Sequence, residues 1–242
     1  MFIDKFQAGE AVLAVMLGNS VGMGYYATDF EVIKTLYGPS RNFAAEYRTS
    51  DLPGGNPRML RAFLKSKNPN SNLINLSGDG WDTNDHLGIS LPSSSVPAHK
   101  STTLTLISLK PKPSLVFIPL QINDANHSVP VPVFASNTRR IVTIIKKFGM
   151  QPVIVKENDT AIRDYPRYQA CISEIATDMK VEVIDTYTPT RNRPDLMRDY
   201  AHPNDAGHQV IFDQYKVWLT KNPKATSVDQ KTSVMFGPSA CL

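Results

Sequence analysis

The chain has 242 residues, of which 41% are hydrophobic and 20% are charged, as is ordinary for a soluble globular protein. This length suits one domain with a sizeable core. The formal net charge is +4, but the lysines and arginines are scattered, which argues against nucleic-acid binding. No apolar run is long enough for a membrane span, and residues 1–10 do not resemble a signal peptide. The sequence leaves two localisations open: the protein is cytoplasmic, or it is part of a larger exported or virion protein.

Two cysteines, Cys171 and Cys241, are too few for a disulfide framework, and no motif surrounds either of them. We therefore expect both to be structural. The last residues of the chain are polar and aperiodic. We predict that the folded domain covers residues 1–222 and that residues 223–242 form a C-terminal tail or linker.

Short apolar segments alternate with segments of helical character along the chain. The apolar segments, which predict buried strands, are residues 11–17, 72–76, 114–120, 152–156 and 181–184. The predicted helices are residues 57–67, 98–109, 137–148, 165–180 and 204–221, with Asn137 and Asn204 as caps. This alternation predicts an α/β fold, a three-layer α/β/α sandwich with a mostly parallel, about five-stranded, flavodoxin-like sheet. Residues 28–55 and 88–97 are irregular and are predicted to be loops at its active edge.

Polar residues follow these strands at their carboxyl ends, where parallel sheets bind ligands. The four blocks, in chain order, are Gly18-Asn19-Ser20, Gly78-Asp79-Gly80, Asn123-Asp124 and Asp199-Tyr200-Ala201-His202. Nucleophilic ester cleavage needs a hydroxyl, a base, a carboxylate that holds the base, and donors for the developing oxyanion. The blocks supply each of these groups.

In the order and spacing of the four blocks, the chain resembles the SGNH (GDSL-type) hydrolase family over about residues 11–221. The resemblance implies a serine esterase in which Ser20 is the nucleophile, His202 is the general base and Asp199 orients His202. It also implies an oxyanion hole formed by the backbone N–H groups of Ser20 and Gly80 and by the side-chain amide of Asn123.

The chain departs from the family pattern at two positions. Asn19 stands where the family usually has Asp, and we expect this residue to be mainly structural. Gln121 replaces a glycine and is expected to narrow the pocket beside Asn123. The choice of Gly80 over Gly78 as the oxyanion donor rests on its distance from Asn75 within the block.

The other polar residues indicate no cofactor and no metal site. The acidic segment around Asp82 does not match a calcium-binding loop and is predicted to be a solvated loop, comprising Asp79, Asp82, Asp85 and His86. Three histidines lack metal-ligand spacing, namely His99, His127 and His208. Trp81 either lines the pocket or packs under its loop. Tyr25 and Tyr26 belong either to the core or to the rim of the pocket.

Two alternative functions remain open. Residues 18–22 match the G-x-S-x-G elbow of α/β-hydrolases, although that elbow normally follows several strands and Ser20 follows the first. The second alternative is an inactive carbohydrate-binding module. For the substrate, residues 6–11 are similar to the start of esterase domains in phage-tail and surface-polysaccharide proteins. This favours a carbohydrate O-acetylesterase acting on a small-molecule or polysaccharide ester. A lipase is less favoured, because no long apolar lid segment is evident.

Overall fold

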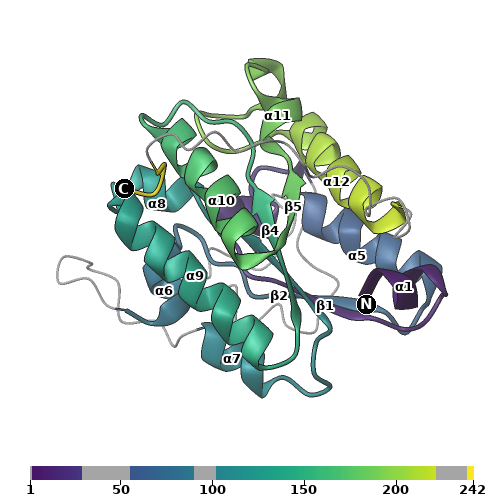
Figure 1. Cartoon of the computed structure of the whole chain (residues 1–242). Helices are drawn as coiled ribbons and strands as arrows, with labels where there is room; N and C mark the ends of the chain where they lie inside the picture. The colour runs from purple at the N-terminus through teal and green to yellow at the C-terminus, as the bar shows by residue number, and fades with distance from the viewer. Residues whose placement is uncertain (1, 29–54, 90–101, 222–238) are drawn as a thin grey trace.

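The computed structural model describes residues 2–28, 55–89, 102–221 and 239–242 (Figure 1). Its strands are β1 (Leu13–Met16), β2 (Asn72–Asn75), β3 (Leu115–Pro119), β4 (Gln151–Lys156) and β5 (Glu182–Asp185). Its helices are α1 (Phe2–Gln7), α2 (Ser20–Met23), α5 (Gly55–Lys67), α6 (Thr83–Leu87), α7 (Thr102–Ser108), α8 (Ile122–Asn126), α9 (Val131–Lys147), α10 (Tyr165–Met179), α11 (Tyr187–Thr190), the 3-10 helix η1 (Pro194–Leu196) and α12 (Asp205–Thr220).

The five strands form one parallel sheet in the order β2-β1-β3-β4-β5. This is the flavodoxin-like order, so the predicted fold class is confirmed. The chain leaves β1 towards β2 on one side and returns to β3 on the other. The carboxyl ends of β1 and β3 therefore flank a topological switch point, which is where a ligand crevice forms in such sheets.

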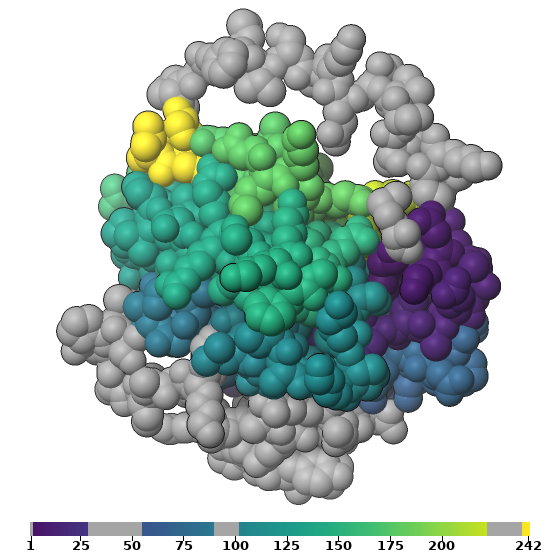
Figure 2. Space-filling model, turned by 60° about the horizontal axis from the view of Figure 1, so that its bottom comes forward, coloured from purple at the N-terminus to yellow at the C-terminus, as the bar shows by residue number. Residues whose placement is uncertain are grey.

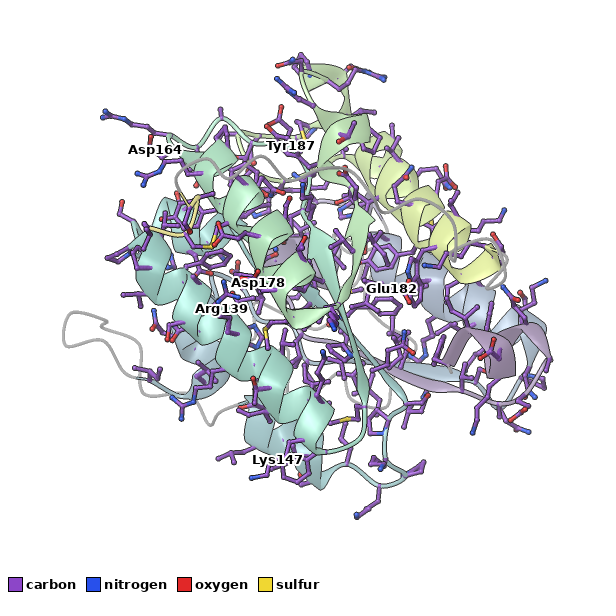
Figure 3. The ribbon with its side chains drawn as sticks, in the orientation of Figure 1. Arg139, Lys147, Asp164, Asp178, Glu182 and Tyr187 are labelled. Carbon is purple, nitrogen blue, oxygen red and sulfur yellow. A yellow bond between two sulfur atoms is a disulfide. The ribbon has the colours of Figure 1, made fainter. Side chains whose placement is uncertain are left out.

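Helices cover both faces of the sheet and complete the three layers (Figure 1). Helices α1, α5 and α12 pack together on one face, and α6, α7, α9 and α10 pack on the other. Figure 3 shows Arg139 of α9 and Asp178 of α10 on neighbouring helices, where their side chains form an ion pair of 2.9 Å. No helix in the described ranges is long and apolar enough to cross a membrane.

The core fixes the closing helix α12 against the centre of the sheet. All five residues of β3 are buried, and the ring of Phe117 meets Tyr215 edge-on at a centroid distance of 5.0 Å. The predicted cap of α12 is confirmed, because the Asn204 side chain accepts a hydrogen bond from the Gly207 N–H at 3.1 Å. A Cβ at Gly207 would lie 2.2 Å from the Leu196 carbonyl oxygen, so only glycine fits here. The loop before α12 is thereby held in place.

The predicted start of α9 is wrong. The helix begins at Val131, and Asn137 lies inside it rather than at its cap. The Asn137 side chain is buried and donates to Thr83 Oγ1 and Asn84 Oδ1, at 3.1 and 2.9 Å. Residues 131–136 are apolar enough to extend the buried face of the helix back by more than one turn. A polar residue that bonds across a helix interface gives the same sequence pattern as a cap.

The other predicted elements agree with the structure to within a few residues, where the structure describes them. The first part of the helix predicted over residues 98–109 and most of the two predicted loops, residues 29–54 and 90–97, lie outside the described residues.

The two cysteines form a disulfide that the sequence analysis did not anticipate. Cys171 lies in α10 and is bonded to Cys241, close to the end of the chain. Ser239 Oγ donates to Glu174 of the same helix at 2.7 Å, and Arg167 donates to the Leu242 oxygen at 3.2 Å. Figure 2 shows these C-terminal residues, in yellow, against the body of the domain. The end of the predicted tail is therefore attached to α10.

Candidate active site

Ser20 is the first residue of the short helix α2, four positions after the end of β1. Asn19 caps this helix, since its side-chain oxygen accepts from the Val21 N–H at 3.0 Å. The turn packs tightly on its neighbours, because a Cβ at Gly18 would lie 2.8 Å from Pro119 at the end of β3. The Ser20 side chain is thus held at the switch point between β1 and β3.

His202 brings a base to this hydroxyl. Its Nε2 lies 2.9 Å from Ser20 Oγ, and its Nδ1 lies 2.9 Å from Asp199 Oδ2. Asp199 Oδ1 also accepts from the backbone N–H groups of Ala201 and His202, both at 2.8 Å. Burial opposes ionisation of Asp199, but these hydrogen bonds outweigh it and lower the pKa of the carboxyl group. An ionised Asp199 is suited to hold a proton on His202 Nδ1, which leaves Nε2 free to accept one from Ser20.

Two tyrosine rings flank the imidazole. The rings of Tyr25 and Tyr26 both lie 5.3 Å from the His202 ring, measured between centroids, and 4.9 Å from each other. Tyr26 has a φ of 62°, a conformation that bulky residues rarely adopt. Both tyrosines are half-buried. Of the two interpretations left open by the sequence, these contacts favour the rim of the site.

Asn123 lies in the first turn of α8, which follows β3. Its side-chain amide donates to the Trp81 carbonyl oxygen at 2.9 Å. The second hydrogen of this amide has no acceptor among the described residues. Trp81 itself packs on its loop, since a Cβ at Gly78 would overlap the indole ring and His86 meets that ring edge-on at 5.4 Å. The Trp81 carbonyl thus fixes Asn123 while leaving one N–H of the amide unused.

The glycines that follow β2 differ in how their N–H groups are used. The Gly78 N–H donates to the Gly18 carbonyl at 3.0 Å, which joins this block to the Ser20 turn. Gly80 has a φ of 71°, and in the described part of the chain no group accepts a hydrogen bond from its N–H. No hydrogen bond joins Gly80 and Ser20 within those same residues. The Gly80 N–H is therefore the one available to a ligand, and Gly78 is committed to holding the two loops together.

The three blocks that follow β1, β2 and β3 thus meet at adjacent strand ends, and the histidine block reaches them from the loop before α12. A scan against protein-family models matches residues 16–210 to the GDSL-like lipase/acylhydrolase family. The chain belongs to this family. It is accordingly an ester hydrolase acting on carboxylic esters, and the family resemblance predicted from the sequence is confirmed. No curated protein sequence matches the chain at a significant level.

Solved structures share the fold of this GDSL-like hydrolase at low sequence identity. A lipolytic protein of the G-D-S-L family from Desulfitobacterium hafniense is 14% identical, with a TM-score of 0.58 over 84% of this chain and 97% of that chain. The acetylxylan esterase Axe2 from Geobacillus stearothermophilus is 15% identical, with a TM-score of 0.61 over 87% and 95% of the two chains. A G-D-S-L family protein from Veillonella parvula is 13% identical, with a TM-score of 0.55 over 87% and 100%.

The prediction of a solvated acidic loop in this GDSL-like hydrolase is wrong for most of its residues. Asp82 is buried and caps α6 by accepting from the N–H groups of Asn84 and Asp85, and the Asp85 side chain returns a bond to the Asp82 N–H. His86 is fully buried between Thr102 Oγ1 and the Gly18 carbonyl. Burial lowers the pKa of His86 to about 4, so it is neutral at physiological pH. Asp82-x-x-Asp85 is a capping box, a signal that the sequence carried.

The buried carboxylate of Glu157 was missed in the sequence analysis. It directly follows β4, and its two oxygens accept hydrogen bonds from Asn19, Gln121 and Ile122. The Gln121 side chain also points to the end of β4, where it bonds the Val155 carbonyl and the Glu157 N–H at 2.9 and 2.8 Å. Gln121 is 1% exposed, so the expected narrowing of the pocket beside Asn123 is not seen. No motif marks a single glutamate after a strand.

The remaining histidines in the described residues have partners within the protein. His127 pairs with Asp82 at 3.1 Å, and His208 is buried with its Nδ1 beside the Asn56 amide at 3.0 Å. His99 lies outside the described residues. Across the ranges that the structure describes, no group of three or more His, Cys, Asp or Glu side chains could hold a metal ion.

Proposed function

We propose that this protein hydrolyses acetyl esters on carbohydrates, through an acyl-enzyme formed on Ser20. The observation that carries the proposal is the continuous chain of hydrogen bonds from Ser20 Oγ through His202 to Asp199. A serine hydroxyl bonded to a histidine that is oriented by a carboxylate is the arrangement that activates a nucleophile for acyl transfer.

The proposed reaction has two halves. Ser20 Oγ attacks the ester carbonyl while His202 Nε2 takes its proton, and the carbonyl oxygen becomes an oxyanion. His202 then gives the proton to the leaving alcohol as the C–O bond breaks, which leaves Ser20 acylated. In the second half a water molecule attacks the acyl group and loses a proton to His202, and that proton returns to Ser20 as the carboxylic acid leaves.

Three N–H groups are proposed to receive the oxyanion. They are the backbone N–H of Ser20, the backbone N–H of Gly80 and the second hydrogen of the Asn123 amide. None of these hydrogens has an acceptor in the described part of the chain. Donors fixed in advance stabilise a charge that develops only in the transition state, and each typically contributes about 10²–10³ in kcat.

The size of the acyl group is inferred from the surroundings of Ser20. Ser20 is only 3% exposed, and Tyr25 and Tyr26 stand beside His202. These contacts favour a small acyl group such as acetyl over a long chain. In the acetylxylan esterase from Geobacillus stearothermophilus, catalytic variants carry substitutions at a serine, an aspartate and a histidine. That aspartate and histidine have the same spacing as Asp199 and His202.

A cavity that is lined in part by Tyr200 supports a sugar as the alcohol. It has a volume of about 590 Å³, is open to solvent, and lies between α8 and the start of α10, near Asp164 in Figure 3. Its lining includes Tyr200, which is 55% exposed and lies between Asp199 and His202 in the chain, together with Arg163 and Arg167. An aromatic face with polar donors suits a saccharide better than an alkyl chain.

Two assays test the proposal. Wild-type protein and Ser20→Ala are compared on chromogenic esters of increasing acyl length, and activity should be highest on acetate and absent in the variant. Tyr200→Ala is then compared with wild type on an acetylated polysaccharide and on the small acetate. The variant should raise KM severalfold on the polysaccharide alone. A preference for long acyl chains, with no release of acetate from any polysaccharide, would instead support the alternative of a lipase.

A further inference from the structure

Glu157 joins the two loops that carry the proposed nucleophile and the proposed oxyanion donor. Its Oε1 accepts from Asn19 Nδ2 at 2.8 Å, next to Ser20. Its Oε2 accepts from the backbone N–H groups of Gln121 and Ile122 at 2.7 and 3.0 Å, directly before Asn123. Glu157 is 1% exposed. One buried carboxylate at the end of β4 therefore holds the start of α2 and the start of α8 in register.

Hydrogen bonds from the Gln121 side chain to the end of β4 reinforce the connection that Glu157 makes. The Gln121 side chain accepts from the Glu157 N–H at 2.8 Å and donates to the Val155 carbonyl at 2.9 Å. Gln169 of α10 adds a further donor to the same Gln121 oxygen at 3.2 Å. The loops after β3 and β4 thus exchange hydrogen bonds in both directions. A shift of Glu157 would therefore also move Gln121 and Asn123, the residues on both sides of Ile122.

The polarity of this contact is fixed. All three groups that face the Glu157 oxygens are donors. Asn19 cannot present its oxygen instead, because that oxygen already accepts from the Val21 N–H at 3.0 Å. An acceptor-only side chain at position 157 therefore requires an amide at position 19. An aspartate at position 19, as in the G-D-S-L order that names this family, would place two carboxylates about 2.8 Å apart. Glu157 gives a physical reason for the Gly-Asn-Ser sequence of this chain.

The ionised form of Glu157 is the one that these donors stabilise. Burial raises the pKa of Glu157 to about 7, and the hydrogen bonds from Ile122, Gln121 and Asn19 hold it below the value that burial alone would give. Three titratable groups face it from the surrounding helices, namely Asp124 of α8, Tyr165 of α10 and Tyr215 of α12. Burial raises the pKa of all three, which disfavours a negative charge on each of them.

We propose that Glu157 is a positioning residue for the esterase reaction, and that Asn19 and Glu157 form a matched pair whose polarity can be exchanged. The proposal rests on the proposed function, in which Ser20 is the nucleophile and Asn123 an oxyanion donor. Exchanging both side chains, with Asn19→Asp and Glu157→Gln in one chain, reverses the hydrogen bond between positions 19 and 157 and keeps the direction of the others. The new carboxylate at position 19 would accept from the Val21 N–H and from the new amide at position 157. The oxygen of that amide would accept from the N–H groups of Gln121 and Ile122.

The test is a double-mutant cycle on kcat with a chromogenic acetate. Glu157→Gln places an N–H group against the Asn19 amide, and Asn19→Asp places a carboxylate against Glu157. Each single variant should lower kcat by about tenfold or more with little change in KM. The double variant N19D/E157Q should recover kcat to within about threefold of wild type. Losses that multiply in the double variant would overturn the proposal.

A pH profile gives a readout that a purely structural role would not produce. In Asn19→Asp, two carboxylates share a site, and the wild-type geometry returns only when one of them is protonated. The ratio of its kcat to that of wild type should therefore rise as pH falls from about 8 to about 6. The double variant has one carboxylate at this site, as the wild type has, so its ratio should change less than that of Asn19→Asp. A flat ratio for Asn19→Asp would contradict the proposed pairing.

Controls separate this proposal from the proposed function. Glu182→Gln and Asn70→Asp make the same chemical changes at sites outside the active site, Glu182 lying at the start of β5 (Figure 3), and should keep kcat within about twofold. Activity retained in Ser20→Ala would reject the proposed function. Thermal unfolding of the wild type and of the variants in the cycle then still measures the coupling between Asn19 and Glu157. If the single variants do not fold, the proposal is tested on kcat of the double variant alone. A kcat about tenfold below that of wild type, or a double variant that does not fold, overturns the proposal.

Discussion

Ser20 Oγ lies 2.9 Å from His202 Nε2, although 182 positions separate the two residues in the chain. The fold creates this contact, because β1 lies inside the sheet, between β2 and β3, and the cap of α12 fixes the loop that carries His202. The Asn158 side chain also holds this loop by donating to the Ala201 carbonyl at 3.1 Å. The base is therefore already in place before a substrate binds.

Removal of the base should be more damaging than neutralisation of its partner. His202→Ala should lower kcat by about 10⁶, and Asp199→Asn by about 10⁴, because Asp199 acts only by orienting and stabilising the imidazole. The lowered pKa of Asp199 keeps this carboxylate ionised down to the acid range. Steady-state kinetics of the two variants from about pH 5 to about pH 9 measure this, and equal losses would give Asp199 a larger role.

Asn123 should affect the transition state rather than substrate binding. Asn123→Ala should lower kcat by about 10²–10³, or roughly 3–4 kcal/mol, with little change in KM. Asn123→Asp should be at least as damaging, because a carboxylate would repel the oxyanion. Both variants also lose the bond to the Trp81 carbonyl, so circular dichroism must show that they are folded. A raised KM with unchanged kcat would assign Asn123 to substrate binding instead.

His86 should make the stability of the protein depend on pH. Its pKa is about 4 in the folded protein and about 6.5 when unfolded, so the unfolded chain binds the proton first as pH falls. The contribution of His86 is complete above about pH 6.5 and decreases towards about pH 4, by roughly 3 kcal/mol. Glu157, whose pKa is raised, contributes in the opposite direction, and its share is lost as pH rises towards about 7. Urea unfolding of wild type and His86→Gln isolates the histidine, and parallel pH profiles would contradict the assignment.

The disulfide should contribute to stability and not to catalysis. Cys241→Ser removes the bond to Cys171 and should reduce the free energy of unfolding by about 2–4 kcal/mol. Reduction of the wild-type protein should produce the same loss. Helix α10 packs against β4 and β5 and supplies none of the proposed catalytic groups. The variant's kcat on acetate should therefore stay within about twofold of the wild-type value. A large loss of kcat in the variant would show that the C-terminal residues support the site.

The strands and most of the helices were predictable because their signals are local. Continuous apolar runs such as residues 114–120 have few alternatives to a buried strand, and Asn204 caps a helix whose amphipathic pattern follows it. The start of α9 was not predictable from the sequence. The Asn137 side chain forms its hydrogen bonds across a helix interface, and a polar residue in this position gives the same sequence pattern as a helix cap. A helix cap and an interior polar contact differ only in tertiary structure.

The proposed catalytic residues could be found from the sequence because four blocks recur in one order. The residues that support them could not. Glu157 is a single glutamate after a strand, and its role depends on donors from positions 19, 121 and 122. Cys171 and Cys241 are 70 positions apart, and two cysteines carry no pairing signal unless the ends of the loop are known to meet.

The most direct test of the account is covalent labelling by a serine-directed phosphonate, followed by peptide mass spectrometry. A serine activated by His202 reacts far faster than a free hydroxyl. The account predicts one adduct, on Ser20, formed in proportion to the loss of esterase activity, and none in His202→Ala under the same conditions. An adduct on another residue, or full labelling of Ser20 with activity intact, would contradict it.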